Sequence, residues 1–165
     1  MTAVSATTLA LILSLHPADE PRMRVIAESI DQVVIEFTPR WQRSSVWLRA
    51  MLITNAHYNG NFAESVHDGT KRGPGGDICI ADINPGNPLW KRHADSFESL
   101  AGTDSESTLR CLRVGAETLV VSLNHCLRER YRTNWLAATF SAYHTSHCWD
   151  SPQRFKRARF ATGLL

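Results

Sequence analysis

The apolar run Val46–Ile53 constrains this chain more than any other stretch, because it is hydrophobic on nearly every side of a helix. A helix of that kind packs in the middle of a fold. The polar residues 57–62 follow it and open into a glycine-rich segment, so the helix should end at the edge of a loop-lined cleft. Many small hydrolases place a catalytic acid at such a helix end, and the side chain that we expect there is Asn59.

Further helices are predicted from apolar spacing and capping signals along the chain. Asp19 and Pro21 suit the start of a helix, and Thr103-x-x-Glu106 fits a capping box. The predicted helices cover Ser5–Leu15, Arg22–Phe37, the stretch after Ser44 or Ser45, a long segment after Thr103, Trp135–Tyr143 and Gln153–Arg159. Between them we expect a loop over 59–76, a short buried strand or extended turn over Ile78–Ile83, and weak helicity over Trp90–Leu100. The pattern predicts a mainly α fold, or α+β with a small irregular or β lobe.

The composition excludes some partners. With 165 residues the chain can form one domain with a sizeable core. Its formal net charge of +2 is too small to indicate a nucleic-acid partner. The apolar stretch Leu9–Leu15 is far shorter than the roughly 20 residues of a membrane span. No Lys or Arg precedes it and no small-residue cleavage site follows, so we expect a retained helix and no clear signal peptide.

Four cysteines allow two disulfides, although four reduced core cysteines are also compatible with the sequence. Cys111 and Cys126 lie on one predicted helix, about 22 Å apart at 1.5 Å per residue, and cannot pair with each other. We favour the pairs Cys79–Cys111 and Cys126–Cys148, which would indicate an extracytoplasmic setting. No pair of cysteines has the close spacing of a zinc site and the histidines are scattered, so we expect neither a metal nor a cofactor.

The order of short motifs resembles the lysozyme-like superfamily, in particular the soluble lytic transglycosylases and goose-type lysozymes. The matching stretches are Asn59-Gly60-Asn61-Phe62, Val66-His67-Asp68-Gly69, Arg72-Gly73-Pro74-Gly75-Gly76, Cys79-Ile80-Ala81-Asp82-Ile83-Asn84, the Cys111-x-x-x-Gly115 of the long helix, and Ala142-Tyr143-His144-Thr145-Ser146. The likeness covers about residues 46–159. It implies one lysozyme-like domain over 1–165, with residues 1–44 as a helical extension packed on a family core at 45–160.

The resemblance also implies which residues form the site. The general acid of the family is a Glu, and its position falls on Asn59, which has no acidic proton to give. The family's Gln falls on Asp82, which is either a substitute acid or a carboxylate that holds its own loop. Tyr143, His144 and Asn84 are the candidate substrate-binding residues. Tyr143 could stack on a sugar or be a core aromatic, and His144 could line the cleft or be exposed.

Two functions follow from the resemblance. The first is a degenerate, catalytically inactive lysozyme-like protein that binds peptidoglycan glycan strands or protein neighbours in an assembly such as a phage particle. The second is an active peptidoglycan-cleaving enzyme with a relocated acid such as Asp82. The basic residues Arg154, Lys156, Arg157 and Arg159 could meet phosphate, but a solvated helix face also accounts for them.

Overall fold

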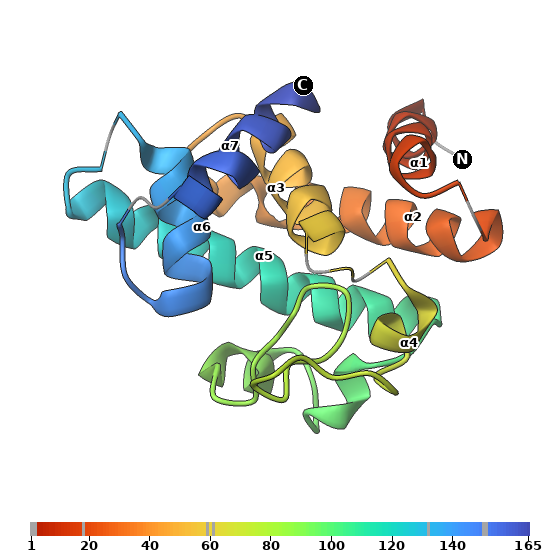
Figure 1. Cartoon of the computed structure of the whole chain (residues 1–165). Helices are drawn as coiled ribbons and strands as arrows, with labels where there is room; N and C mark the ends of the chain where they lie inside the picture. Colours follow the sequence, from red (N-terminus) through yellow and green to blue (C-terminus); the bar gives the residue numbers. More distant parts are fainter. Residues whose placement is uncertain (1–2, 18, 59, 61, 132, 150–151) are drawn as a thin grey trace.

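A computed structural model describes residues 3–17, 19–58, 60, 62–131, 133–149 and 152–165, and shows a mainly helical fold (Figure 1). The α-helices are α1 (Ala3–Leu15), α2 (Glu20–Phe37), α3 (Ser45–Tyr58), α4 (Glu64–His67), α5 (Ser105–Arg128), α6 (Trp135–Thr145) and α7 (Pro152–Gly163). Three 3₁₀ helices join them: η1 (Thr38–Arg40), η2 (Pro88–Arg92) and η3 (Glu98–Leu100). None of the described helices combines the length and the apolarity needed to cross a bilayer.

Helix α5 is the axis of the fold. In Figure 1 it runs across the molecule, with α2 and α3 on one side and the irregular segment between α4 and α5 on the other. Helices α2 and α6 pack directly on α5, α1 packs on α2, and α7 packs on α3 and α6. Apolar residues of α5 such as Leu112, Leu119 and Leu123 are fully or almost fully buried, as the stripe on the predicted helix requires.

Gly115 explains how the irregular segment comes close to α5. A Cβ atom at this position would meet the Ala81 Cβ at 2.8 Å and the Tyr143 Oη at 3.4 Å. Only a residue without a side chain lets the 78–83 turn and α6 approach the helix this closely. The turn and Tyr143 therefore meet over one point of α5.

Both favoured disulfides are present. Cys79 pairs with Cys111 and Cys126 pairs with Cys148, with Cα–Cα distances of 6.3 and 5.3 Å. The first links the 78–83 turn to the first half of α5, and the second links the end of α5 to the segment after α6. Disulfides of this kind persist in an oxidising, extracytoplasmic setting.

Several local predictions hold. Asp19 caps α2 by accepting from the Arg22 backbone N–H, with Pro21 in the first turn. The long helix and Trp135–Tyr143 are found with slightly different ends.

Others were wrong in detail. The capping residue of α5 is Asp104 and not Thr103, because the Asp104 carboxylate accepts from the N–H groups of Glu106 and Ser107. The predicted loop over 59–76 contains the short helix α4.

The β part of the prediction reduces to one contact. Within the described ranges there is no strand, and Ile78 and Ile83 form an isolated antiparallel bridge around a tight turn. The weakly helical stretch Trp90–Leu100 is divided between η2 and η3. Short segments of this kind carry too few residues for periodicity to separate a turn from a strand or a helix.

Candidate functional site

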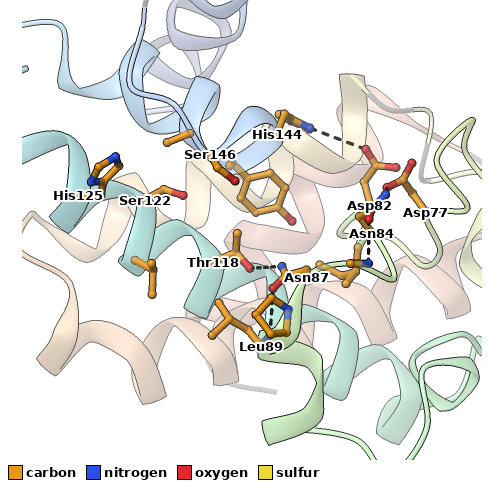
Figure 2. Close-up of a pocket in the computed structure, with 16 residues that line it drawn as sticks. Asp77, Asp82, Asn84, Asn87, Leu89, Thr118, Ser122, His125, His144 and Ser146 are labelled. Carbon is orange, nitrogen blue, oxygen red and sulfur yellow. Dashed lines mark hydrogen bonds and ion pairs between the residues drawn. The ribbon is translucent and has the colours of Figure 1, made fainter.

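A cavity of about 670 Å³ opens between α5, α6 and the segment 77–89 (Figure 2). Its lining is mixed, with carboxylates, amides, hydroxyls and imidazoles beside a few apolar side chains. The lining residues are Asp77, Asp82, Ile83, Asn84, Gly86, Asn87, Pro88, Leu89, Thr118, Val121, Ser122, His125, Ala142, Tyr143, His144 and Ser146. Four residues singled out from the sequence (Asp82, Asn84, Tyr143 and His144) thus lie in one cavity.

A strained turn brings Asp82 to this cavity. The backbone N–H groups of Ile78 and Ile83 each donate to the other residue's carbonyl, and the N–H of Asp82 donates to the Cys79 carbonyl. Cys79 and Asp82 have φ angles of 61° and 57°, a left-handed conformation that is rare for residues with a side chain. The Cys79–Cys111 disulfide and the burial of Ile78 and Ile83 hold this turn on α5.

The surroundings of Asp82 favour its protonated form. Burial raises its pKa to about 6, the negative charge of Asp77 adds to the effect, and the positive charge of Arg157 opposes it. The side chain is still 24% exposed, so the acid is open to the cavity. Among the described residues, no hydrogen bond from a backbone amide reaches the Asp82 carboxylate, unlike a carboxylate that holds its own loop.

Asn84 and Asp77 organise the loop beside Asp82. The Asn84 amide donates to Asp77 Oδ1 at 3.0 Å and to the Gly75 carbonyl at 3.2 Å, and its oxygen accepts from the Gly86 N–H. A Cβ at Gly75 would lie 2.7 Å from the Asn84 Nδ2, so a larger residue there would displace the Asn84 amide from this position. Asn84 therefore lines the cavity, but its polar atoms already bond to the loop.

Tyr143 and His144 come from α6. The Tyr143 hydroxyl donates to the Ala81 carbonyl, which ties α6 to the turn of Asp82. Burial, and then the charge of Asp82, raises the pKa of Tyr143 well above its usual value. His144 Nδ1 lies 4.0 Å from Asp82 Oδ2, and its side chain is 15% exposed. Burial, followed by the charges of Arg157 and Arg154, lowers the pKa of His144 to about 3, so its ring is neutral.

Helix α5 supplies a second polar wall that the sequence predictions missed. Thr118, Ser122 and His125 recur at i, i+4 and i+7 and share one face of the helix. The Thr118 hydroxyl accepts from Asn87 Nδ2 at 2.9 Å and donates to the Val114 carbonyl. The sequence did contain a signal for this wall, because three polar residues at this spacing form one polar face on a helix whose other face is apolar.

The position expected for the family's acid, Asn59, lies outside the described residues, so its relation to the cavity stays a prediction. In the part of the chain that the structure covers, no group of three or more His, Cys, Asp or Glu side chains is placed to hold a metal ion. The cavity is built instead from single polar groups suited to hydrogen bonding.

Comparison of the chain with protein-family models, with curated proteins and with solved structures gives no match in any of the three.

Proposed function

We propose that the cavity beside Asp82 binds a glycan strand, and that this lysozyme-like chain holds peptidoglycan without cutting it. The observation that supports this proposal is the lining of the cavity. A volume of about 670 Å³ falls in the range of small-molecule sites. Hydroxyl and amide groups from α5 and from the segment 77–89 line it together with the apolar side chains of Leu89 and Val121, which suits a sugar ring, because such a ring has both hydroxyl groups and apolar faces.

The absence of cleavage is proposed from the sequence. Glycoside cleavage requires a proton donor at the leaving oxygen. The resemblance assigns that role to the position of Asn59, where an amide cannot release a proton at the pH of a cell. Loss of a general acid slows such reactions by a factor of about 10² to 10⁴. A protein with this substitution would still bind the glycan in its cavity but would no longer cleave it.

A second candidate function is peptidoglycan cleavage with Asp82 as the relocated acid. One observation favours it: burial raises the pKa of Asp82 to about 6, which is where a glycosidase needs its proton donor. Asp77 lines the same cavity and carries a second carboxylate. Glycoside hydrolases typically use a pair of carboxyl groups in different environments.

Activity assays with three variants, D82N, N59E and N59A, separate the candidates. Dye-labelled, purified peptidoglycan is incubated with the wild type and with each variant. Binding without cleavage predicts that the wild type and D82N release no fragments and that N59E, which restores the family's acid, releases them. Relocated-acid catalysis predicts release by the wild type, a loss of at least 10²-fold in D82N, and retention in an N59A control.

Binding itself is tested by calorimetry with soluble peptidoglycan fragments. Val121 is 46% exposed and lines the cavity, whereas Ile35 is 73% exposed and lies on α2. The V121E variant places a charge in the cavity and is expected to weaken binding at least tenfold. The matched I35E control should bind like the wild type. Equal affinity of all three proteins, or no binding by the wild type, would refute the glycan site.

The setting of this function is also a proposal. Two disulfides suit a protein that works outside a reducing compartment, where peptidoglycan is found. Its partners there would be glycan strands or neighbouring proteins of an assembly such as a virion. Sedimentation with intact cell-wall sacculi, compared between the wild type and V121E, tests the first of these partners.

A further inference from the structure

The contact between α7 and His144 fixes the hydrogen atoms of the imidazole ring. Arg157 Nη1 lies 3.0 Å from His144 Nε2. A guanidinium group has only donors, so the imidazole nitrogen must accept and cannot carry a hydrogen. In a neutral ring the single N–H is then on the other nitrogen, Nδ1. Burial lowers the pKa of His144 and so favours the neutral ring, which carries only this one hydrogen.

The nitrogen that carries this hydrogen faces Asp82. His144 Nδ1 lies 4.0 Å from Asp82 Oδ2, and both side chains line the cavity (Figure 2). At this distance the two groups do not form a hydrogen bond with each other. Both can therefore bond to one ligand atom placed beside them. The pair offers a donor from His144 and an acid group from Asp82.

Arg157 is itself held in place. Its Nη1 also donates to Asn55 Oδ1 at 3.2 Å, and its guanidinium carbon lies 5.4 Å from the centre of the Tyr58 ring. Burial lowers the pKa of Arg157 to about 10, which leaves the group charged at neutral pH. Asn55 and Tyr58 belong to the last turn of α3, so three helices meet at this guanidinium. A charged, anchored donor next to His144 is available across the physiological pH range.

We propose that Arg157 is a positioning residue that holds His144 as the Nδ1–H tautomer, so that the cavity presents an N–H donor beside Asp82 to an oxygen of the bound glycan. This inference deepens the proposed function and rests on it for the identity of the ligand. The oxygens that could accept are a sugar hydroxyl, a ring or bridging oxygen, or an acetamido carbonyl. The neutral ring has a second consequence: it leaves Asp82 without an adjacent imidazolium that would draw its proton away.

The tautomer is tested on the free protein by ¹⁵N NMR of the histidine rings. In the wild type, Nε2 of His144 should show the shift of an unprotonated nitrogen and Nδ1 that of a protonated one at pH 7. The R157M variant should lose this pattern, with the two tautomers averaging or the ring titrating closer to the ordinary histidine range. The conservative R157K variant retains a donor and should keep the pattern. R159M, on the exposed side of the same helix, is the matched control.

An Nε2–H tautomer in the wild type, or a pattern unchanged in R157M, would overturn the inference. If R157M does not fold, the wild-type and R157K spectra still decide the tautomer. This readout needs no ligand, so its failure is distinct from failure of the glycan site.

The use of the donor is tested by binding of soluble peptidoglycan fragments. Removal of one hydrogen bond to the ligand is expected to weaken binding about three- to tenfold in R157M and in H144F, with R157K and R159M near the wild type. Wild-type affinity in H144F would overturn the role of the donor. Fixed tautomers together with no binding in any protein would refute the proposed ligand and leave the positioning role of Arg157 intact.

Discussion

At the scale of single residues, Asp82 shows how a backbone conformation sets the chemistry of a side chain. Its φ of 57° turns the chain back over Cys79 and directs the carboxyl group toward the cavity. Packing of the turn against α5 and α6 then removes water from one side of the group. The raised pKa follows from this partial burial and from Asp77, and not from any hydrogen bond within the described residues.

Replacement of Asp82 by Asn should reveal this effect as a pH-dependent gain in stability. In the folded wild type the group holds its proton up to about pH 6, whereas in the unfolded chain it loses the proton near pH 4. Asp82 therefore contributes to the stability of the wild type at low pH, and this contribution is lost as the pH rises from about 4 to about 6. D82N avoids the loss, and Asn tolerates the left-handed conformation.

The measurement is chemical denaturation of both proteins between pH 4 and pH 8. The difference in unfolding free energy should increase with pH and level off above pH 6, at no more than about 3 kcal/mol. A constant difference across this range would show that Asp82 titrates normally.

His67 is a second residue whose role only its partners explain. It is fully buried, and its Nε2 lies 2.8 Å from Thr108 Oγ1. The Thr108 hydroxyl donates to the Asp104 carbonyl, so it must accept from His67. Burial lowers the pKa of His67 to about 4, and the ring is neutral in the folded protein.

The T108V variant should lose about 1 to 3 kcal/mol of unfolding free energy, because the buried His67 N–H is left without an acceptor. Thr139 is the matched control: it is equally buried, and its hydroxyl bonds to the Trp135 carbonyl one turn earlier. T139V also removes a hydrogen bond from a threonine hydroxyl to a backbone carbonyl, but it leaves no histidine N–H without an acceptor. It should therefore lower the free energy of unfolding by less than T108V does. Equal losses in urea denaturation of T108V and T139V would contradict the assigned role of His67.

At the scale of elements, helix α5 carries contacts that organise both sides of the molecule. Its buried Glu117 accepts from Arg40 at 2.9 Å and Arg92 at 2.8 Å through Oε1, and bonds to His93 through Oε2 at 2.7 Å. Burial alone would raise the pKa of Glu117, but these hydrogen bonds outweigh it and hold the pKa below its usual value. The cluster ties η1 and η2 to α5 and so supports the wall of the cavity near Leu89.

The two disulfides make different predictions for the cavity. Each closes a loop of similar size, with sequence separations of 32 and 22, so removal of either should cost about 3 to 4 kcal/mol in the chain-entropy model. Only the Cys79–Cys111 disulfide attaches the turn that carries Asp82 to α5. The C79A/C111A variant should therefore also shift the Asp82 pKa toward its usual value, whereas C126A/C148A should leave it near 6.

Carboxyl ¹³C NMR titration of the two variants measures this difference. The paired design separates a loss of overall stability from a local change at the turn. The same Asp82 titration in both variants would mean that the disulfide is not what holds the turn.

At the scale of the whole molecule, the N-terminal helix is part of the same packed structure as the cavity. Ile12 of α1 is fully buried in the main core, and Thr8 donates to Asp31 of α2 at 2.7 Å. Arg49 of α3 donates to the same Asp31 oxygen at 2.9 Å. The end of α1 also reaches α3, where His16 Nε2 lies 3.3 Å from His57 Nδ1.

This shared core predicts that the chain unfolds in one cooperative step. Far-UV circular dichroism and tryptophan fluorescence should give coincident urea transitions. Hydrogen exchange adds a local readout, since buried amides of α1 should show a free energy of opening close to that of α5. An earlier transition confined to α1 would instead mean that this helix can unfold separately from the rest of the molecule.

The sequence alone determined the helical character of this chain, since apolar spacing, Pro21 and the Asp19 cap act within a few residues of each other. It also excluded a bond between Cys111 and Cys126, because a rigid helix keeps these two residues apart whatever surrounds them, and the two disulfides of the structure join each of them to another cysteine. Local pattern was less informative for the 59–76 segment and for the cap at Asp104, where neighbouring candidates differ only in geometry.

Tertiary structure alone decided the cavity. Thr118 and Ser122 lie far in sequence from Asp82, and Arg157 meets His144 only because α7 packs across α3 and α6. Hydrogen-bond direction and burial depend on such long-range contacts, so neither the tautomer of His144 nor the acidity of Asp82 could be predicted from residue order.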